Sequence, residues 1–206
     1  MYIIERILID ENNHEASVTC TGESFLITLK DIEALNIAEG DDIDEDTYQH
    51  LCEAVSRLAC IKKAFEYLSY SDMSAKKLSD KLRSRFYKEI IMDVTELLKE
   101  RGYLNDVSLA ERYARSFYEF KHWGPIRIKS DLYSRGFKQE DIAEACSFLD
   151  QTDHRENIRH LVEKKYGTDG ERLGMQKQKI CAYLYRMGYL YEDICDTVNS
   201  MSDTDK

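Results

Sequence analysis

The sequence contains a single proline and nine glycines among 206 residues, well below the usual share of these two residue types. Turn-rich β-sandwiches depend on such residues, so their shortage argues against that class and favours long helices. Apolar residues make up 43% of the chain and charged residues 33%, which suits helices that bury one face and expose the other. An apolar share of this size can form a hydrophobic core, which argues against a disordered or fibrous chain.

Long hydrophobic stretches are also missing. No run of about 18 apolar residues occurs, and residues 1–10 lack the basic segment and cleavage site of a secretory signal. We therefore expect a cytoplasmic protein without membrane contact. The six cysteines form no CxxC pair and the five histidines no HExxH motif, so the sequence predicts reduced thiols and no metal site.

Catalytic signatures are absent as well. The chain has no P-loop, no GxGxxG and no GxSxG motif. The segment Gly167-Thr168-Asp169-Gly170 has no strand before it and no Lys-Ser/Thr after it, which favours a connection between helices over a phosphate loop. No catalytic residue and no cofactor are predicted, and we interpret the protein as a non-enzyme.

The charge is distributed unevenly. Residues 1–60 hold 3 basic and 14 acidic side chains, a net of −11, and residues 61–206 hold the other 26 basic and 25 acidic ones, a net of +1. Residues 155–188 are locally basic, with eight basic against four acidic side chains. Non-specific nucleic-acid binding relies on neutralising phosphates, so the acidic balance argues against it and allows at most a weakly basic contact face.

Hydrophobic periodicity separates the first part of the chain from the rest. Apolar and polar residues alternate over 2–9, 16–20 and 25–29, which predicts a small antiparallel meander. Downstream of Asp46 the period becomes helical, for example in the stripe formed by Leu109, Tyr113, Phe117 and Phe120. The acidic run 40–46 is typical of a helix start, and Gly124-Pro125 predicts a helix with proline in its first turn.

An internal repeat organises the helical part. Residues 129–137 align with 181–189 at an offset of 52, and an offset of 50 aligns Leu132 with Leu82 and Phe137 with Tyr87. We predict a mainly α fold of tandem three-helix repeats, an elongated and curved array in which neighbouring units stack. The predicted segments are a β meander at 1–45, repeats at 46–105 and 106–152, and a third repeat with an acidic tail at 153–206.

Three ordered motifs carry a resemblance to a known family. They are Glu100-Arg101-Gly102-Tyr103-Leu104-Asn105-Asp106 followed by Leu109-Ala110, then Trp123-Gly124-Pro125-Ile126-Arg127-Ile128, then Leu132-x-x-Arg135-Gly136-Phe137. Together they resemble the RecX family of bacterial regulatory proteins over about residues 60–201. The resemblance implies tandem three-helix repeats that modulate RecA recombinase filaments on single-stranded DNA in recombination and repair.

Three classes of function remain open from the sequence. They are a regulator of RecA filaments without chemistry of its own, a tandem helix-turn-helix protein that binds duplex DNA directly, and a scaffold for another partner. Weak direct binding to DNA is compatible with the acidic balance. The protein is expected to be a monomer. The candidate partner-binding residues are basic side chains of the second and third repeats: Arg127, Lys129, Arg135, Lys164, Lys165, Lys177, Lys179 and Arg186.

Overall fold

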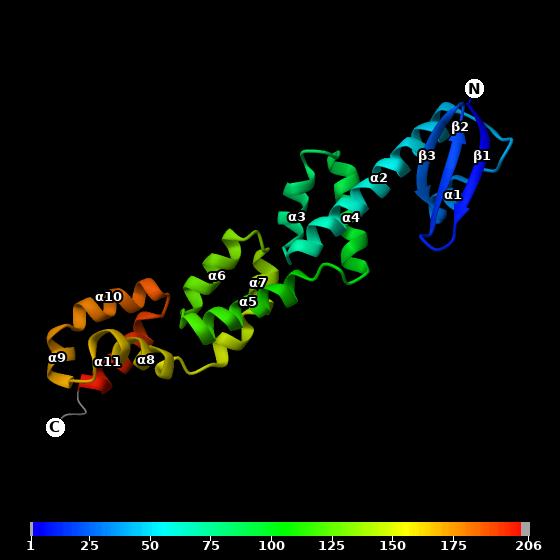
Figure 1. Ribbon diagram of the computed structural model, residues 1–206. Coiled ribbons are helices and arrows are strands. Elements are labelled where there is room, and N and C mark those ends of the chain that lie inside the picture. Colours follow the sequence, from blue (N-terminus) through cyan, green and yellow to red (C-terminus); the bar gives the residue numbers. More distant parts are fainter. Residues whose placement is uncertain (1, 203–206) are drawn as a thin grey trace. The chain divides into compact units, whose positions relative to one another are not determined.

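The computed structural model describes residues 2–202, and within this range the chain forms four β-strands, eleven α-helices and one 3-10 helix (Figure 1). The described residues divide into two compact units. One holds the residues up to 73 together with 77–104, and the other holds 74–76 together with the residues from 105 onward. The mainly helical chain with a small N-terminal sheet confirms the predicted fold class.

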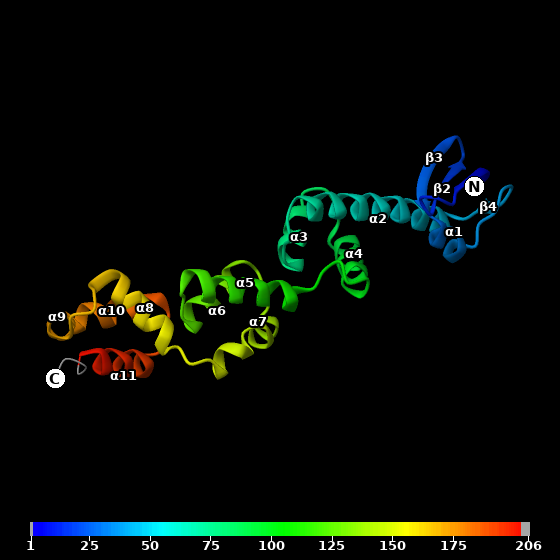
Figure 2. The same ribbon diagram turned by 60° about the horizontal axis from the view of Figure 1, so that its bottom comes forward.

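The N-terminal sheet consists of β1 (Tyr2–Asp10), β2 (Glu15–Cys20), β3 (Glu23–Thr28) and β4 (Asp42–Ile43). Its order is β3-β2-β1-β4, with antiparallel neighbours throughout. The first three strands are the predicted meander. The sequence did not predict β4, because two residues leave no periodic pattern. This strand, labelled in Figure 2, pairs with the start of β1 at the sheet edge.

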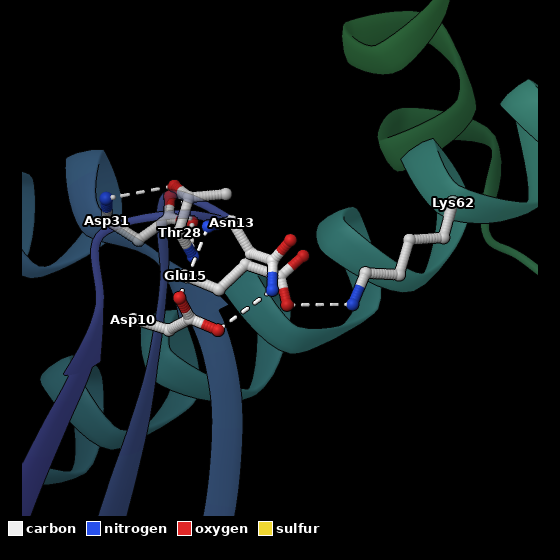
Figure 3. Close-up of polar contacts among 6 residues, drawn as sticks. All are labelled: Asp10, Asn13, Glu15, Thr28, Asp31 and Lys62. Atoms are coloured by element: carbon white, nitrogen blue, oxygen red, sulfur yellow. Dashed lines mark hydrogen bonds and ion pairs between the residues drawn. The ribbon is translucent and has the colours of Figure 1, made fainter.

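A capping box starts α1 (Leu29–Leu35) directly after β3. The Asp31 backbone N–H donates to Thr28 Oγ1 at 3.2 Å, and the Thr28 backbone N–H donates to the Asp31 carboxylate at 3.0 Å. Figure 3 shows these two residues beside the turn between β1 and β2. The Asp31 carboxylate is buried and also pairs with Arg57, so one side chain caps α1 and ties it to the following helix.

The longest helix, α2 (Glu45–Tyr70), begins where the acidic run ends. Asp44 is its N-cap and accepts a hydrogen bond from the Thr47 backbone N–H at 2.8 Å. The hydrogen bonds from Thr47 lower the pKa of Asp44. Glu45 and Asp46 lie in the first turn, where a carboxylate opposes the positive end of the helix dipole. The prediction of a helix start at this run is confirmed.

The first repeat continues with α3 (Ala75–Leu82) and α4 (Lys88–Glu100). The alignment of Tyr87 with Phe137 was wrong, because Tyr87 is 79% exposed whereas Phe137 is buried. In the second and third repeats, Gly136 and Gly188 follow the middle helix and adopt positive φ angles. The first repeat has no glycine at this position, after α3. Its chain therefore leaves α3 differently, and Tyr87 becomes the exposed N-cap residue of α4.

The second repeat comprises α5 (Asp106–Lys121), α6 (Pro125–Ser134), α7 (Gln139–Ala145) and a 3-10 helix (Ser147–Gln151). Pro125 occupies the first turn of α6, as predicted. Phe120 was wrongly assigned to the buried stripe of α5, since it is 78% exposed. Trp123 takes that place, because the chain turns back after α5 and packs the indole against the core.

The third repeat comprises α8 (Arg155–Tyr166), α9 (Gly170–Met175), α10 (Lys177–Met187) and α11 (Tyr191–Ser202). Gly167 ends α8 and Asp169 caps α9, so the segment 167–170 connects two helices, as predicted. Residues 203–206, which complete the predicted acidic tail, lie outside the described residues.

The leucines at the equivalent position of the three repeats are all buried. Leu82, Leu132 and Leu184 are each 0% exposed. Leu132 and Leu184 belong to the separate cores of the second and third repeats. The burial of all three supports the alignment at the position on which it most depends.

Candidate partner-binding surface

A row of aromatic rings follows α5 into the turn that leads to α6. Tyr113 stacks on Phe117 with 6.0 Å between ring centroids, and Phe117 lies 4.8 Å from Trp123. The backbone N–H of Trp123 donates to the Phe117 carbonyl at 3.2 Å, after His122 has ended α5 in a left-handed conformation. The turn thus places Trp123 beside Phe117, half-buried at the edge of the core.

Three cationic groups cover this row. Lys121 Nζ lies 4.5 Å from the Trp123 centroid, Arg127 Cζ 4.1 Å from the same ring, and Arg135 Cζ 5.1 Å from the Tyr113 ring. A cation over an aromatic face gains about 0.5–1 kcal/mol at an exposed site. We call these six residues the cation–aromatic row. Because cations lie over the rings, the row offers fixed positive charge and leaves less aromatic face open for stacking.

Arg127 also takes part in the contact between the second and third repeats. Its Nη1 donates to Met187 Sδ at 3.4 Å, and its side chain is half-buried. A Cβ added to Gly188 would lie 2.4 Å from the Arg127 Cβ. Arg127 is therefore partly a packing residue of this contact.

The contact itself is a close approach of two glycines. The Gly124 N–H donates to the Met187 carbonyl at 2.7 Å, and the Ile126 N–H donates to the Gly188 carbonyl at 3.0 Å. A Cβ on Gly124 would lie 2.3 Å from the Gly188 carbonyl carbon, closer than any side chain permits. We call this contact the glycine junction. It fixes the start of α6 against the end of α10.

Neutral polar groups surround the glycine junction. The Tyr189 hydroxyl donates to the His122 carbonyl at 3.0 Å, and the Asn157 side-chain amide donates to the Tyr118 carbonyl at 3.2 Å. The Tyr118 hydroxyl oxygen lies 3.1 Å from His154 Nδ1. Burial lowers the pKa of His154 and raises the pKa of both Tyr118 and Tyr189. The lowered pKa favours the neutral form of His154, and both tyrosines are uncharged near neutral pH.

Two of the predicted residues, Lys129 in α6 and its C-cap residue Arg135, form ion pairs within the second repeat. Arg135 pairs with Asp131 one turn earlier, and Lys129 Nζ lies 3.4 Å from Asp150 of the 3-10 helix. At 100° per residue, Lys129 and Arg127 lie on nearly opposite sides of α6. The basic residues of α6 and its C-cap therefore do not form one continuous strip.

The third repeat gathers basic side chains around Tyr183. Lys165 Nζ lies 3.6 Å from the Tyr183 centroid. Lys179 and Arg186 are four residues before and three after Tyr183 in α10, so all three share one helix face. We call Lys165, Lys179, Arg186 and Tyr183 the Tyr183 cluster.

The remaining predicted residues, Lys164 and Lys177, are exposed near a helix end and a helix start respectively. Among residues 2–202, neither they nor Lys179 and Arg186 form an ion pair. These four side chains are therefore not engaged by a carboxylate of the described chain. Sequence reasoning missed Lys121, although its position four residues after Phe117 and two before Trp123 carried the signal.

Other kinds of site find little support in the described part of the chain. Residues 2–202 contain no cluster of three His, Cys, Asp or Glu side chains able to hold a metal ion. Burial raises the pKa of the Cys60 and Cys146 thiols to about 11, which suppresses their reactive thiolate form. No described helix is long and apolar enough to cross a membrane.

The tandem three-helix units of the described chain define a helical-repeat protein. A family model described as the second three-helix domain of RecX matches residues 105–145, and one described as the third matches residues 152–198. The regulatory protein RecX of Caldanaerobacter subterraneus is 30% identical over 203 residues, which cover 96% of this chain and 98% of that protein. The regulatory protein RecX of Clostridioides difficile is 29% identical over 201 residues, covering 95% and 93%.

Two crystal structures of RecX proteins resemble the structure of this chain. A crystal structure of a regulatory protein RecX has a TM-score of 0.78 and covers 97% of this chain and 100% of its own, and at 18% identity this likeness concerns the fold. The crystal structure of RecX from Lactobacillus salivarius has a TM-score of 0.62 at 28% identity, covering 72% and 97%. The chain belongs to the RecX family of regulatory proteins, and its role is regulatory.

Proposed function

We propose that this protein binds RecA filaments assembled on single-stranded DNA and modulates recombinase activity without catalysing a reaction itself. The observation that carries the proposal is the set of fixed or unpaired cations on the second and third repeats. A filament on DNA is polyanionic, so such cations favour docking and accelerate encounter. Membership of the RecX family supports RecA as the protein component of that filament.

The proposal assigns the contact to particular residues. Lys179 and Arg186 are the principal contacts because they are exposed and have no ion pair among residues 2–202. Lys164, Lys165 and Lys177 add charge nearby in sequence. Arg127, Lys129 and Arg135 contribute less, because each already has a partner within the second unit.

Further parts of the proposal concern organisation. We propose that the segments 1–45, 46–105, 106–152 and 153–206 act as successive parts of an elongated monomer in the cytoplasm. Light scattering and small-angle scattering of the full chain measure both mass and shape. A dimer mass or the scattering of a compact sphere would contradict this part.

The test uses the double variant Lys179→Glu/Arg186→Glu. RecA, ATP and single-stranded DNA are incubated with the protein, and co-sedimentation, ATP hydrolysis and strand exchange are measured. Each exposed ionic contact is worth up to about 1 kcal/mol, so we expect filament affinity to fall about tenfold or more once repulsion is added. The wild-type protein should change ATP hydrolysis and strand exchange, and the sign of the change identifies it as inhibitor or activator.

The matched control is Arg6→Glu/Lys88→Glu, which changes the net charge by the same amount at exposed positions of the first unit. We expect this control to bind filaments as the wild type does. Wild-type affinity in the Lys179/Arg186 variant, with its circular dichroism unchanged, would show that these cations are an ordinary solvated surface.

Direct binding to DNA is the second candidate, favoured by the repeated helix-turn-helix arrangement. Titration with bare single-stranded and duplex DNA separates it from the first. We expect only weak binding, because the chain carries a net charge of −10. Tight binding to bare duplex that exceeds binding to the filament would favour this candidate instead.

A further inference from the structure

The first unit contains a groove that none of the candidate partner-binding residues line. It lies where the β1–β2 turn and α1 approach α2 and the end of α4, and its volume is about 940 Å³. That volume is within the range of sites that bury small ligands or a few amino-acid residues. Leucine and isoleucine side chains form much of its lining: Leu58, Ile61, Leu97 and Leu98. Phe65 and Tyr103 add an edge-to-face aromatic pair with 4.8 Å between centroids.

Two ion pairs at the groove present their cationic partners to solvent. Lys62 Nζ lies 2.8 Å from Glu15 (Figure 3), and Arg57 pairs with Asp31. The Lys62 side chain is 51% exposed and that of Glu15 only 17%, and the corresponding values for Arg57 and Asp31 are 43% and 2%. Both carboxylates are thus covered while both cations remain accessible.

Two further cations line the groove without a competing partner. Lys30 and Arg101 are exposed, and neither forms an ion pair within residues 2–202. Residues 1–60 contain only three basic side chains, Arg6, Lys30 and Arg57, and two of them line this groove. Two of the three cations of an otherwise acidic region therefore lie beside this apolar groove.

We propose that the groove binds a short polypeptide segment in which carboxylates alternate with bulky apolar side chains. The apolar lining would take the leucine-like or aromatic side chains, and Lys30 and Arg101 would pair with the carboxylates. A nucleic-acid strand fits less well, because the −11 charge of residues 1–60 repels a long polyanion on either side of the groove. A short segment with two or three carboxylates stays within the groove, where the cations offset the repulsion from the acidic side chains.

The experiment selects random heptapeptides displayed on phage against the immobilised full-length protein. We expect the enriched peptides to share at least two acidic residues and one leucine, phenylalanine or tryptophan. One enriched peptide is then synthesised with a fluorophore, and its Kd is measured by anisotropy alongside a version with Asn and Gln in place of Asp and Glu. The uncharged version should bind at least tenfold more weakly.

Matched variants locate the binding. Lys30→Gln/Arg101→Gln removes two positive charges from the groove, and Arg6→Glu changes the net charge equally on β1, outside the groove. Lys30 and Arg101 are exposed, so the fold should survive, and circular dichroism verifies it. We expect the Kd of the acidic peptide to rise about tenfold in the double variant and less than twofold in Arg6→Glu.

Several outcomes would overturn the proposal. They are a selection without an acidic and apolar consensus, equal binding of the charged and uncharged peptides, and equal loss of affinity in the two variants. Oligothymidylate and vesicles containing phosphatidylglycerol are tested in parallel. If either binds the wild type and Arg6→Glu but not the double variant, the groove takes nucleic acid or lipid and the peptide proposal is wrong.

Discussion

At the scale of single residues, Leu132 tests the repeat most directly. Its side chain is 0% exposed in the core of the second repeat. Leu132→Ala should lower the free energy of unfolding by about 2–5 kcal/mol, because it removes buried apolar surface and leaves a cavity. Urea denaturation followed by circular dichroism measures the change. The neighbouring variant Tyr133→Ala, at a position 69% exposed, should stay within about 0.5 kcal/mol of the wild type.

His154 makes stability depend on pH. Burial lowers its pKa in the folded state, so the unfolded chain binds a proton at a higher pH than the folded chain does. The contribution of neutral His154 is complete above its unfolded pKa of about 6.5 and is lost as the pH falls through the folded value. We expect Tm to decline between pH 7.5 and pH 5 with a smaller slope in His154→Gln. His50→Gln, an exposed control in α2, should keep the wild-type slope.

At the scale of elements, the sequence predicted those that have a periodic pattern or a helix-start signal. It did not predict a two-residue strand or a contact that depends on tertiary structure. Alternation predicted β1 to β3, and the acidic run and Pro125 predicted the starts of α2 and α6. β4 could not be predicted, because its two residues are held by pairing with β1 rather than by their own propensity. The exposure of Phe120 depended on the turn that brings Trp123 back to Phe117, a contact that helical periodicity does not contain.

The glycine junction predicts a large difference between two glycine substitutions. Gly124→Ala places a methyl group 2.3 Å from the Gly188 carbonyl, so the two repeats must separate or strain. We expect the free energy of unfolding to fall by about 1–3 kcal/mol. Hydrogen exchange should become faster at the backbone amides of positions 124 and 126, which donate across the junction. Gly174→Ala is the control, because nothing lies within 4 Å of its added Cβ and its site is helical. It should be neutral or stabilise by up to about 1 kcal/mol. Equal effects of the two substitutions would mean that the junction does not hold in solution.

At the scale of the whole molecule, the sequence could select basic residues but not how each is used. Lys129 and Asp150 are 21 positions apart, so their pairing depends on tertiary structure. The packing of Arg127 on Met187, 60 positions away, has the same origin. The choice of these residues as a partner-binding surface stays a prediction, and the division between paired and unpaired cations depends on tertiary contacts that the sequence does not contain.

Together with the proposed function, that division predicts how filament binding depends on salt. If Lys179 and Arg186 contact phosphates, each contact contributes about 0.7 to the slope of log affinity against log salt for single-stranded DNA. Lys179→Gln/Arg186→Gln should then make the slope shallower by about 1.4, with the largest loss of affinity at low salt. Lys129→Gln/Arg135→Gln removes the same charge from groups already paired with Asp150 and Asp131, and its slope should change much less. Co-sedimentation with RecA filaments between about 50 and 200 mM salt gives all three slopes. Parallel lines for the wild type and the Lys179/Arg186 variant would mean that these two cations do not meet phosphate, and filament binding would then rest on contacts with protein.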